Sequence, residues 1–332
     1  MIAQRVRALG AKRLAAYAAT WVIWGSTYLA IRVAVQDVPP FLLVAVRSLL
    51  AGAILVGWAV LRGQPKPNRA QVHAAVLVGA MFFLVGHGGL FWAEQRVASG
   101  PAALMIATEH FWMLLAGLAV GQVIATARAW AGVAVGLAGV ALLTIGGSGS
   151  GALDPVGAAV LLVASAAWGV GTLYFTGARK PRSQAYAAGL PLLAGGALTL
   201  GLSAAVGEPA RFSLAEVTPV AAGALLYLVL FGSVVAFTAY SWLVEREGPS
   251  RALSFTYVNP LVAVLLGAAV LHEPLTLRVA AAAAAIVAAV VLIVGGTAAR
   301  SAPAEPYHAV GRSAAAGRGE KRAAAPGRCV PV

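Results

Sequence analysis

The stretch ALMIATEHFW at residues 103–112 returns in altered form as ALSFTYVNPL at residues 252–261, 149 residues further along the chain. The same offset still holds where each block ends, in an apolar run followed by Gly-Gly. An earlier echo pairs Trp24-Gly25 with Trp168-Gly169, 144 residues apart. The chain therefore consists of two halves of about 150 residues that share one plan. Such a duplication favours transport, because two equivalent halves can rock against each other and expose a site to either side of a membrane.

The composition indicates that the chain lies in a lipid bilayer. Hydrophobic residues make up 60% of its 332 residues and charged residues only 11%, with a mean hydropathy of +0.85. Soluble proteins carry roughly 25% charged residues, so this chain cannot cover itself with a water-compatible surface. Its single cysteine, Cys329, excludes a disulfide framework and a thiolate metal site within one chain. We expect no metal and no cofactor.

Ten apolar runs have the length of a membrane-spanning helix, which requires about 20 residues. They are predicted at 14–36, 39–61, 72–95, 99–122, 127–147, 155–176, 184–206, 218–243, 250–272 and 277–297. A closed barrel would require alternating apolar and polar positions, which these runs lack. The sequence therefore predicts an all-α integral membrane protein of ten helices.

The predicted spans divide the chain into five parts. Residues 1–13 form a basic N-terminal segment, 14–147 a first five-helix repeat, 148–154 a linker, 155–297 a second repeat and 298–332 a disordered basic tail. Because five is an odd number, the second repeat enters the membrane from the opposite side, and the repeats are inverted.

Positive charge supports this arrangement. With both termini in the cytoplasm, most of the 24 lysines and arginines fall in the inner loops and the tail, as expected for a protein of the cell's inner or plasma membrane. The net charge of +13 does not indicate a nucleic-acid partner, since the cations are scattered and do not form one patch. Contact with anionic lipid headgroups is sufficient to explain it.

Several motifs resemble one known family. TWVIWGSTYLAIRVAV in the first span, SGPAALMIAT at 99–108 and YVNPLVAVLLGAAVLHEPLT at 257–276 are similar to EamA-type members of the drug/metabolite transporter superfamily. The resemblance covers about residues 15 to 297. It implies ten helices in two inverted repeats, a central cavity lined by the first, third, fourth, sixth, eighth and ninth helices, and export of amino acids, metabolites or drugs. The chain departs from the family pattern at His110, where a proline is usual, and at Gln122, where a glutamate is usual.

Glu109 is the sharpest candidate for a functional residue. It lies near the middle of the fourth span, where a charged side chain costs about 2.5–3.5 kcal/mol to insert. As a cavity carboxylate it would bind a substrate ammonium or a proton, and as a packing residue it would be protonated or hydrogen-bonded. The sequence leaves both interpretations open.

Other polar and aromatic side chains are expected deep in the spans. His87, Phe91 and Glu94 follow one helical face, and aromatic faces can hold a cation or stack on a ring. The cavity is predicted to be lined by Trp24, Tyr28, His87, Phe91, Glu109, Trp112, Trp168, Tyr257 and Asn259. For each of these, plain packing or an interhelical hydrogen bond is the alternative. Glu109, Glu94 and Arg47 are the candidates for charge coupling, and Pro260 is the candidate hinge, because proline interrupts helical hydrogen bonding.

The leading hypothesis is a secondary transporter that exports small amphipathic metabolites, such as amino acids or drug-like compounds, by alternating access. Proton coupling through Glu109 is a secondary hypothesis, and the protein is expected to act as a monomer or homodimer. A membrane-embedded enzyme that uses Glu94, Glu109 and the histidines as acid–base groups is the alternative, although no hydrolase signature such as H-E-x-x-H or G-x-S-x-G occurs. A membrane scaffold without transport activity is a third option.

Overall fold

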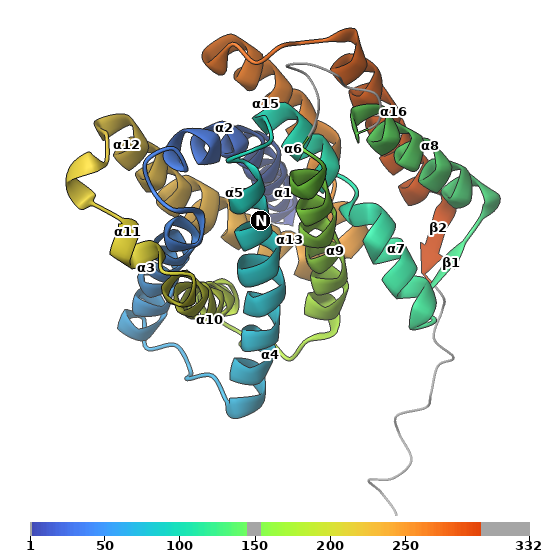
Figure 1. Ribbon diagram of the computed structural model, residues 1–332. Helices are drawn as coiled ribbons and strands as arrows, with labels where there is room; N and C mark the ends of the chain where they lie inside the picture. The colour runs from blue at the N-terminus through green and yellow to red at the C-terminus, as the bar shows by residue number, and fades with distance from the viewer. Residues whose placement is uncertain (1, 145–153, 300–332) are drawn as a thin grey trace, which may run out of the picture.

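A computed structural model describes residues 2–144 and 154–299. The helices gather into one bundle, with most connections lying at its two ends (Figure 1). In chain order the elements are α1 (Ile2–Ala18), η1 (Ala19–Ile23), α2 (Trp24–Ala34), α3 (Pro40–Leu61), α4 (Arg69–Gly79), η2 (Ala80–His87), α5 (Gly88–Ala93), α6 (Ser99–Ile106), α7 (Glu109–Ala119), β1 (Val123–Ala125), α8 (Ala127–Thr144), α9 (Pro155–Gly177), α10 (Gln184–Ala205), α11 (Glu208–Arg211), η3 (Leu214–Glu216), α12 (Pro219–Tyr227), η4 (Leu228–Val235), α13 (Ala236–Glu247), α14 (Pro249–Ala252), α15 (Phe255–Leu271), α16 (Leu277–Gly296) and β2 (Thr297–Ala299).

Nine helical segments in the described ranges are long and apolar enough to cross a membrane, and Ala127–Leu143 forms a tenth, shorter apolar helix. The predicted ten-helix membrane fold is confirmed. The helix that contains the first span begins earlier than predicted, since α1 already starts at Ile2. Most of the expected linker at 148–154 and of the expected tail at 298–332 lies outside the described residues.

The packing of the spans has an internal two-fold pattern. The second span (α3) packs most extensively against the seventh (α10), and the fifth (α8) against the tenth (α16), so equivalent helices of the two halves meet. The first span contacts the ninth through α2 and α15, and its equivalent, the sixth span α9, contacts the fourth through α7. Likewise α9 packs on the third span at η2, while α2 packs on the eighth at α12. Each of these contacts thus has a counterpart in the other half.

Small residues allow the spans of the two halves to approach closely. A Cβ atom added at Gly195 of α10 would lie 2.6 Å from the carbonyl oxygen of Gly79 and 2.6 Å from Cβ of Phe83. At the other pair, a Cβ on Gly132 of α8 would lie 2.8 Å from the carbonyl oxygen of Ala289 in α16. Lipid supplies little hydrophobic drive between helices, so this close van der Waals packing contributes to holding the halves together.

Three spans contain a π-helical segment, and two spans are interrupted. η1, η2 and η4 lie within the first, third and eighth spans, where π turns commonly mark functional positions. The fourth span is broken between Ile106 and Glu109, and the ninth between Ala252 and Phe255. Two short strands were not predicted from the sequence: β1 pairs antiparallel with β2, and this pairing joins the loop after α7 to the end of α16.

Carboxylates cap the N-termini of helices in the opposite half. Glu208 accepts hydrogen bonds from the backbone N–H groups of Phe41 (3.3 Å) and Leu42 (2.7 Å) at the start of α3. Glu273 accepts from the N–H and hydroxyl groups of Ser99, both at 2.9 Å, at the start of α6. The free N–H groups and the positive end of the helix dipole stabilise negative charge at these positions.

A third carboxylate bridges the halves in the reverse direction. Asp37, in the loop before α3, accepts from the N–H (2.9 Å) and hydroxyl (2.6 Å) groups of Thr218, the residue that caps α12. These bonds from the hydroxyl and the backbone lower the pKa of the Asp37 carboxyl below its usual value. Loops alternate between the two ends of a bundle, so Asp37, Glu208 and Glu273 all lie at the same rim.

Candidate functional site: the central cavity

A small cavity lies between the two halves, in the middle of the bundle. Its volume is about 40 Å³, which is room for about three water molecules. Its lining residues come from the first, third, fourth, sixth and ninth spans: Trp24, Thr27, Tyr28, Gly86, His87, Leu90, Ile106, Glu109, Ala164, Trp168, Phe255 and Asn259. Six of the nine residues predicted to line it are in this set.

Glu109 reaches the cavity because the fourth span is broken just before it. α6 ends at Ile106, and α7 starts again at Glu109 after a turn at Ala107 and Thr108. The Thr108 hydroxyl occupies the break, bonding to the Met105 carbonyl (2.7 Å) and to the Ser165 hydroxyl (2.8 Å). Glu109 is only 2% exposed, and its Oε2 atom has no hydrogen-bond partner.

One further side chain of the lining has a buried polar atom without a partner. This atom is Nδ1 of His87. Buried polar groups are nearly always hydrogen-bonded, and leaving one unsatisfied costs about 1–3 kcal/mol. Two such groups beside one cavity indicate a place where a ligand or water completes the hydrogen bonding.

Aromatic rings form one wall of the cavity. The ring of Trp24 packs edge-on against Phe255 (centroids 4.7 Å apart) and Trp168 (5.7 Å), while Phe82 stacks on the opposite side of the cluster against Trp168 at 4.3 Å. Tyr240 of α13 packs behind Trp24 at 5.1 Å. Sequence reasoning missed Phe82, Tyr240 and Phe255, although Phe255 lies within the repeated block at 252–261.

The eighth span supports this wall from behind. The resemblance implied that the eighth helix lines the cavity, but in the described chain the eighth span supplies none of the lining residues. Instead, the Nε1 atom of Trp24 donates to the Gly232 carbonyl of η4 at 2.9 Å, and the Tyr240 hydroxyl bonds to Thr172 at 2.5 Å. These contacts place the indole ring between the eighth span and the hollow.

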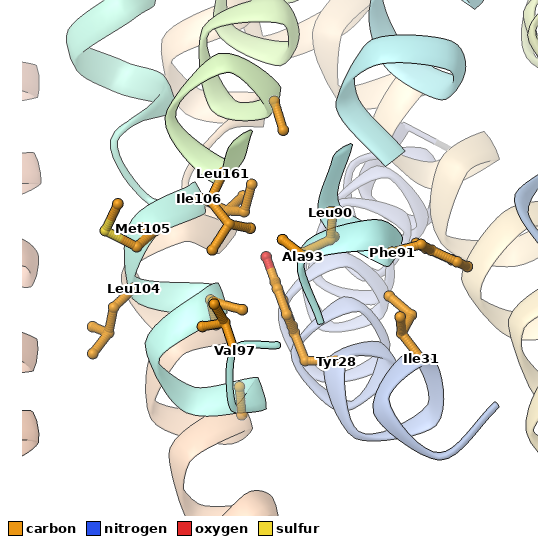
Figure 2. Close-up of a cluster of buried hydrophobic side chains, with 14 of the residues drawn as sticks. Tyr28, Ile31, Leu90, Phe91, Ala93, Val97, Leu104, Met105, Ile106 and Leu161 are labelled. Atoms are coloured by element: carbon orange, nitrogen blue, oxygen red, sulfur yellow. The ribbon is translucent and has the colours of Figure 1, made fainter. Parts of the chain in front are cut away.

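The wall of the cavity toward the rim that carries Glu273 is apolar. Figure 2 shows the Tyr28 side chain crossing this region, with its hydroxyl between Ile106 and Leu90. Tyr28, Leu90 and Ile106 belong to the buried apolar cluster that also contains Val97 and Leu161. The cavity is therefore bordered on this side by packed apolar side chains.

Asn259 connects the ninth span to the π-helical segment of the first. With its amide nitrogen facing the available acceptors, Nδ2 lies 2.8 Å from the Trp21 carbonyl oxygen and 3.3 Å from that of Thr20. Carbonyls in and beside a π turn lose their regular helical donors, and the Asn259 amide satisfies two of them. α15 runs without interruption through Pro260, and the break in this span lies at Leu253 and Ser254 instead.

The remaining predicted residues lie away from the lining. Phe91 is fully buried beneath the Arg47 guanidinium, 5.3 Å from its ring centroid. Trp112 packs on Phe111, with ring centroids 5.0 Å apart, and the Tyr257 hydroxyl reaches the Val290 carbonyl at 3.5 Å.

The two other charged candidates are also buried outside the cavity. The Nε atom of Arg47 donates to the Ser233 hydroxyl at 2.8 Å, so this cation is held between the second and eighth spans. Glu94 is fully buried, both of its carboxylate oxygens lack partners, and its backbone carbonyl accepts from Arg32. Neither side chain contacts the cavity lining directly through a hydrogen bond in the described residues.

A second, larger hollow lies at the rim. It has a volume of about 240 Å³ and is lined by residues that include Arg32, Arg96, Gly100, Glu273 and Val279. Sequence reasoning did not predict it, because its residues come from loops and helix ends far apart in the chain. Its lining mixes charged and apolar side chains and includes Val97, a member of the buried apolar cluster that contains Tyr28.

Comparison with known proteins assigns the family. The model of the EamA-like transporter family matches residues 14–145 and again 155–295. The chain belongs to this family. The EamA-like chain is 38% identical over 262 residues to the protein named uncharacterized inner membrane transporter YedA of Escherichia coli K12, covering 78% of this chain and 82% of that protein.

Two further matches extend the comparison. A protein of Streptantibioticus cattleyicolor named probable terminal-alkyne amino-acid exporter is 30% identical over 260 residues, covering 76% of this EamA-like chain and 84% of that protein. A crystal structure of another protein superimposes with a TM-score of 0.60 at 20% identity, over 85% of this chain and 97% of that one, and so shares its fold. These relatives give the membrane-enzyme alternative no support.

Proposed function

We propose that this protein is a secondary transporter that exports small amphipathic metabolites by alternating access. The observation that carries the proposal is the central cavity, which lies between the two halves and contains a buried carboxylate oxygen without a partner. Each half contributes to the lining, so movement of one half against the other changes access to the same groups.

The two sides of the cavity supply the parts that alternating access requires. On one side Tyr28, Leu90 and Ile106 pack in one buried apolar cluster, and on the other Trp24 and Trp168 pack in a second. The proposed movement separates one of these layers at a time. Because one chain contains the whole cavity, a monomer and a homodimer would both hold complete sites.

The proposed orientation places both termini in the cytoplasm and the Asp37–Glu208–Glu273 rim outside, following the positive-inside rule. In this orientation the two repeats, residues 14–147 and 155–297, are inverted in the membrane. Glu109 would then exchange a proton or a substrate cation between the two sides. Arg47 and Glu94 would act in the surrounding structure, since their side chains are buried away from the lining.

Proteoliposomes containing the purified protein test the proposal. An imposed pH gradient should drive saturable movement of labelled amphipathic amines or amino acids, and collapse of the gradient with a protonophore should reduce it. Flux that equals that of empty liposomes for all solutes, with protein that is folded and inserted, would contradict transport. Unchanged pH dependence in the Glu109→Gln protein would remove this residue from the coupling.

A further inference from the structure

The charge of the cavity lining is one-sided. Among the described residues that line it, Glu109 is the one acidic side chain, and the set contains no lysine or arginine. His87 supplies a hydrogen-bonding ring without a permanent charge, and it packs against Phe83 (5.2 Å) and Trp168 (4.9 Å). The lining therefore offers a partner for a positive group and none of comparable strength for a negative one.

The nearby buried cation Arg47 lies outside the lining. Its Nε atom donates to the Ser233 hydroxyl and its guanidinium lies over the Phe91 ring, while its Nη1 atom has no hydrogen-bond partner. Phe91 and Ser233 hold it between the second, third and eighth spans.

The aromatic wall complements a positive head group as well. Trp24, Trp168, Phe255 and Tyr28 all line the cavity, and the face of a tryptophan or tyrosine ring attracts a cation within about 6 Å. When water is excluded from the site, this cation–π attraction reaches about 2 kcal/mol. The same rings offer apolar surface to the rest of an amphipathic molecule.

We infer that this cavity selects amphipathic amines with one positive charge over zwitterionic amino acids of the same side chain. The ammonium group donates to Oε2 of Glu109, the atom without a partner, and the apolar part lies against Trp24, Trp168 and Phe255. This inference deepens the proposed function and rests on it, because it names the substrate class of the same site.

The preference follows from the cost of a second charge. An α-carboxylate in the cavity would lie beside Glu109 and would meet no lysine or arginine among the residues that line it. A buried charge without a partner is strongly destabilising. Selectivity of this kind arises from rejection of the wrong ligand as much as from attraction of the right one. A carboxylic acid without an amine would lack the attraction between ammonium and Glu109 and would still bury an unpaired negative charge.

The cavity volume defines what the closed state can hold. About 40 Å³ accommodates an ammonium group or a few water molecules, and not a whole aromatic amine. The head group therefore binds at Glu109, and the remainder of the molecule occupies space that opens as the aromatic layer separates.

Three compounds with one phenyl ring and different charges test the inference: phenethylamine, phenylalanine and 3-phenylpropionate. Calorimetric titration of the purified full-length protein in detergent measures their affinities. We expect phenethylamine to bind at least tenfold more tightly than the other two. Glu109→Gln should weaken phenethylamine binding at least tenfold, whereas Glu216→Gln, the same change at an exposed carboxylate, should leave it unchanged.

Each contrary result overturns the inference. The first is that phenylalanine binds as tightly as phenethylamine. The second is that Glu109→Gln leaves the affinity for phenethylamine unaltered. The third is that none of the three compounds binds the wild-type protein. The ranking of compounds on the wild-type protein does not depend on the folding of a variant.

Flux measurements separate this inference from the proposed function. Saturable transport of phenylalanine that is indifferent to Glu109→Gln would preserve transport and reject amine selectivity. Glu109-dependent binding of phenethylamine without protein-mediated flux of any of the three would preserve the site and reject transport.

Discussion

Replacing Gly195 with alanine tests whether close packing between the halves stabilises the bundle. The added Cβ would lie 2.6 Å from the Gly79 carbonyl oxygen and 2.6 Å from Cβ of Phe83, nearer than real Cβ contacts come. Both neighbours are backbone or the inflexible base of a side chain, so α10 must shift away from the third span. Overpacking of this kind costs about 1–3 kcal/mol.

The matched control is Gly201→Ala in the same helix. A Cβ at Gly201 meets nothing within 4 Å, so this substitution adds the same methyl group without a clash. In water, replacing a helical glycine with alanine stabilises by about 1 kcal/mol, so Gly201→Ala should be neutral or stabilising.

Unfolding by SDS in mixed micelles, followed by circular dichroism, measures the free energies of the two variants. We expect Gly195→Ala to unfold at a lower SDS fraction than the wild type, and Gly201→Ala at an equal or higher fraction. If the two variants unfold together, the contact between α10 and the third span does not have the tightness described here, and the reasoning fails.

Three further predictions concern the polar contacts between the halves. Glu273→Gln removes the negative charge that caps α6. Hydrogen bonds to a charged group are worth about 1.5–3 kcal/mol, so the thermal midpoint of this variant should fall measurably. An unchanged midpoint would mean that the charge of the cap does not stabilise the protein. Asp37→Asn should lower the thermal midpoint at pH 6, and the midpoints of the variant and the wild type should converge below about pH 4. The pKa of the Asp37 carboxyl is lower in the folded protein than in the unfolded chain. The ionised carboxylate therefore stabilises the fold above its unfolded pKa, and this stabilisation is lost as the pH falls through its folded pKa. A difference that persists unaltered at low pH would reject this role. Asn259→Ala should leave the Trp21 carbonyl without its donor and destabilise the protein by about 1–3 kcal/mol. Asn259→Gln, which keeps an amide group, is the control for loss of side-chain volume. An unchanged thermal midpoint in the alanine variant would contradict this role.

The sequence predicts the number of helices and their bounds well, because long apolar runs have one physical solution in lipid. It also places Glu109, His87 and Trp168 in the cavity, since polar and aromatic groups deep in a span are expensive to expose to lipid. The composition of each span and the depth of a residue within it can both be read from a single sequence.

A shared helical face does not by itself place a side chain in the cavity, as Phe91 and Trp112 show. The ring centroid of His87, the last residue of η2, lies 5.9 Å from that of Phe91, so the two share a face as predicted, but Phe91 packs beneath Arg47 outside the lining. Trp112 lies one turn after Glu109 in α7 and packs on Phe111. Depth along the span, as well as the helical face, decides which side chains reach the cavity.

Contacts between distant segments are the other part that the sequence does not show. The bonds from Glu273 to Ser99 and from Glu208 to Leu42 join residues more than 160 positions apart, and no local pattern announces them. The rim hollow depends on these contacts and was therefore missed.

The carboxylate caps make the two ends of a duplicated molecule chemically unlike. At the Asp37–Glu208–Glu273 rim, helix N-termini are held by charges from the opposite half, whereas at the other end Arg13 pairs with Glu247 at 2.9 Å, with the arginine side chain 57% exposed to solvent. Concentrated salt screens an exposed ion pair more strongly than a carboxylate bound to backbone amides. Rising ionic strength should thus weaken the Arg13–Glu247 end of the molecule before the carboxylate-capped rim, so the two ends should respond unequally to the salt content of the buffer.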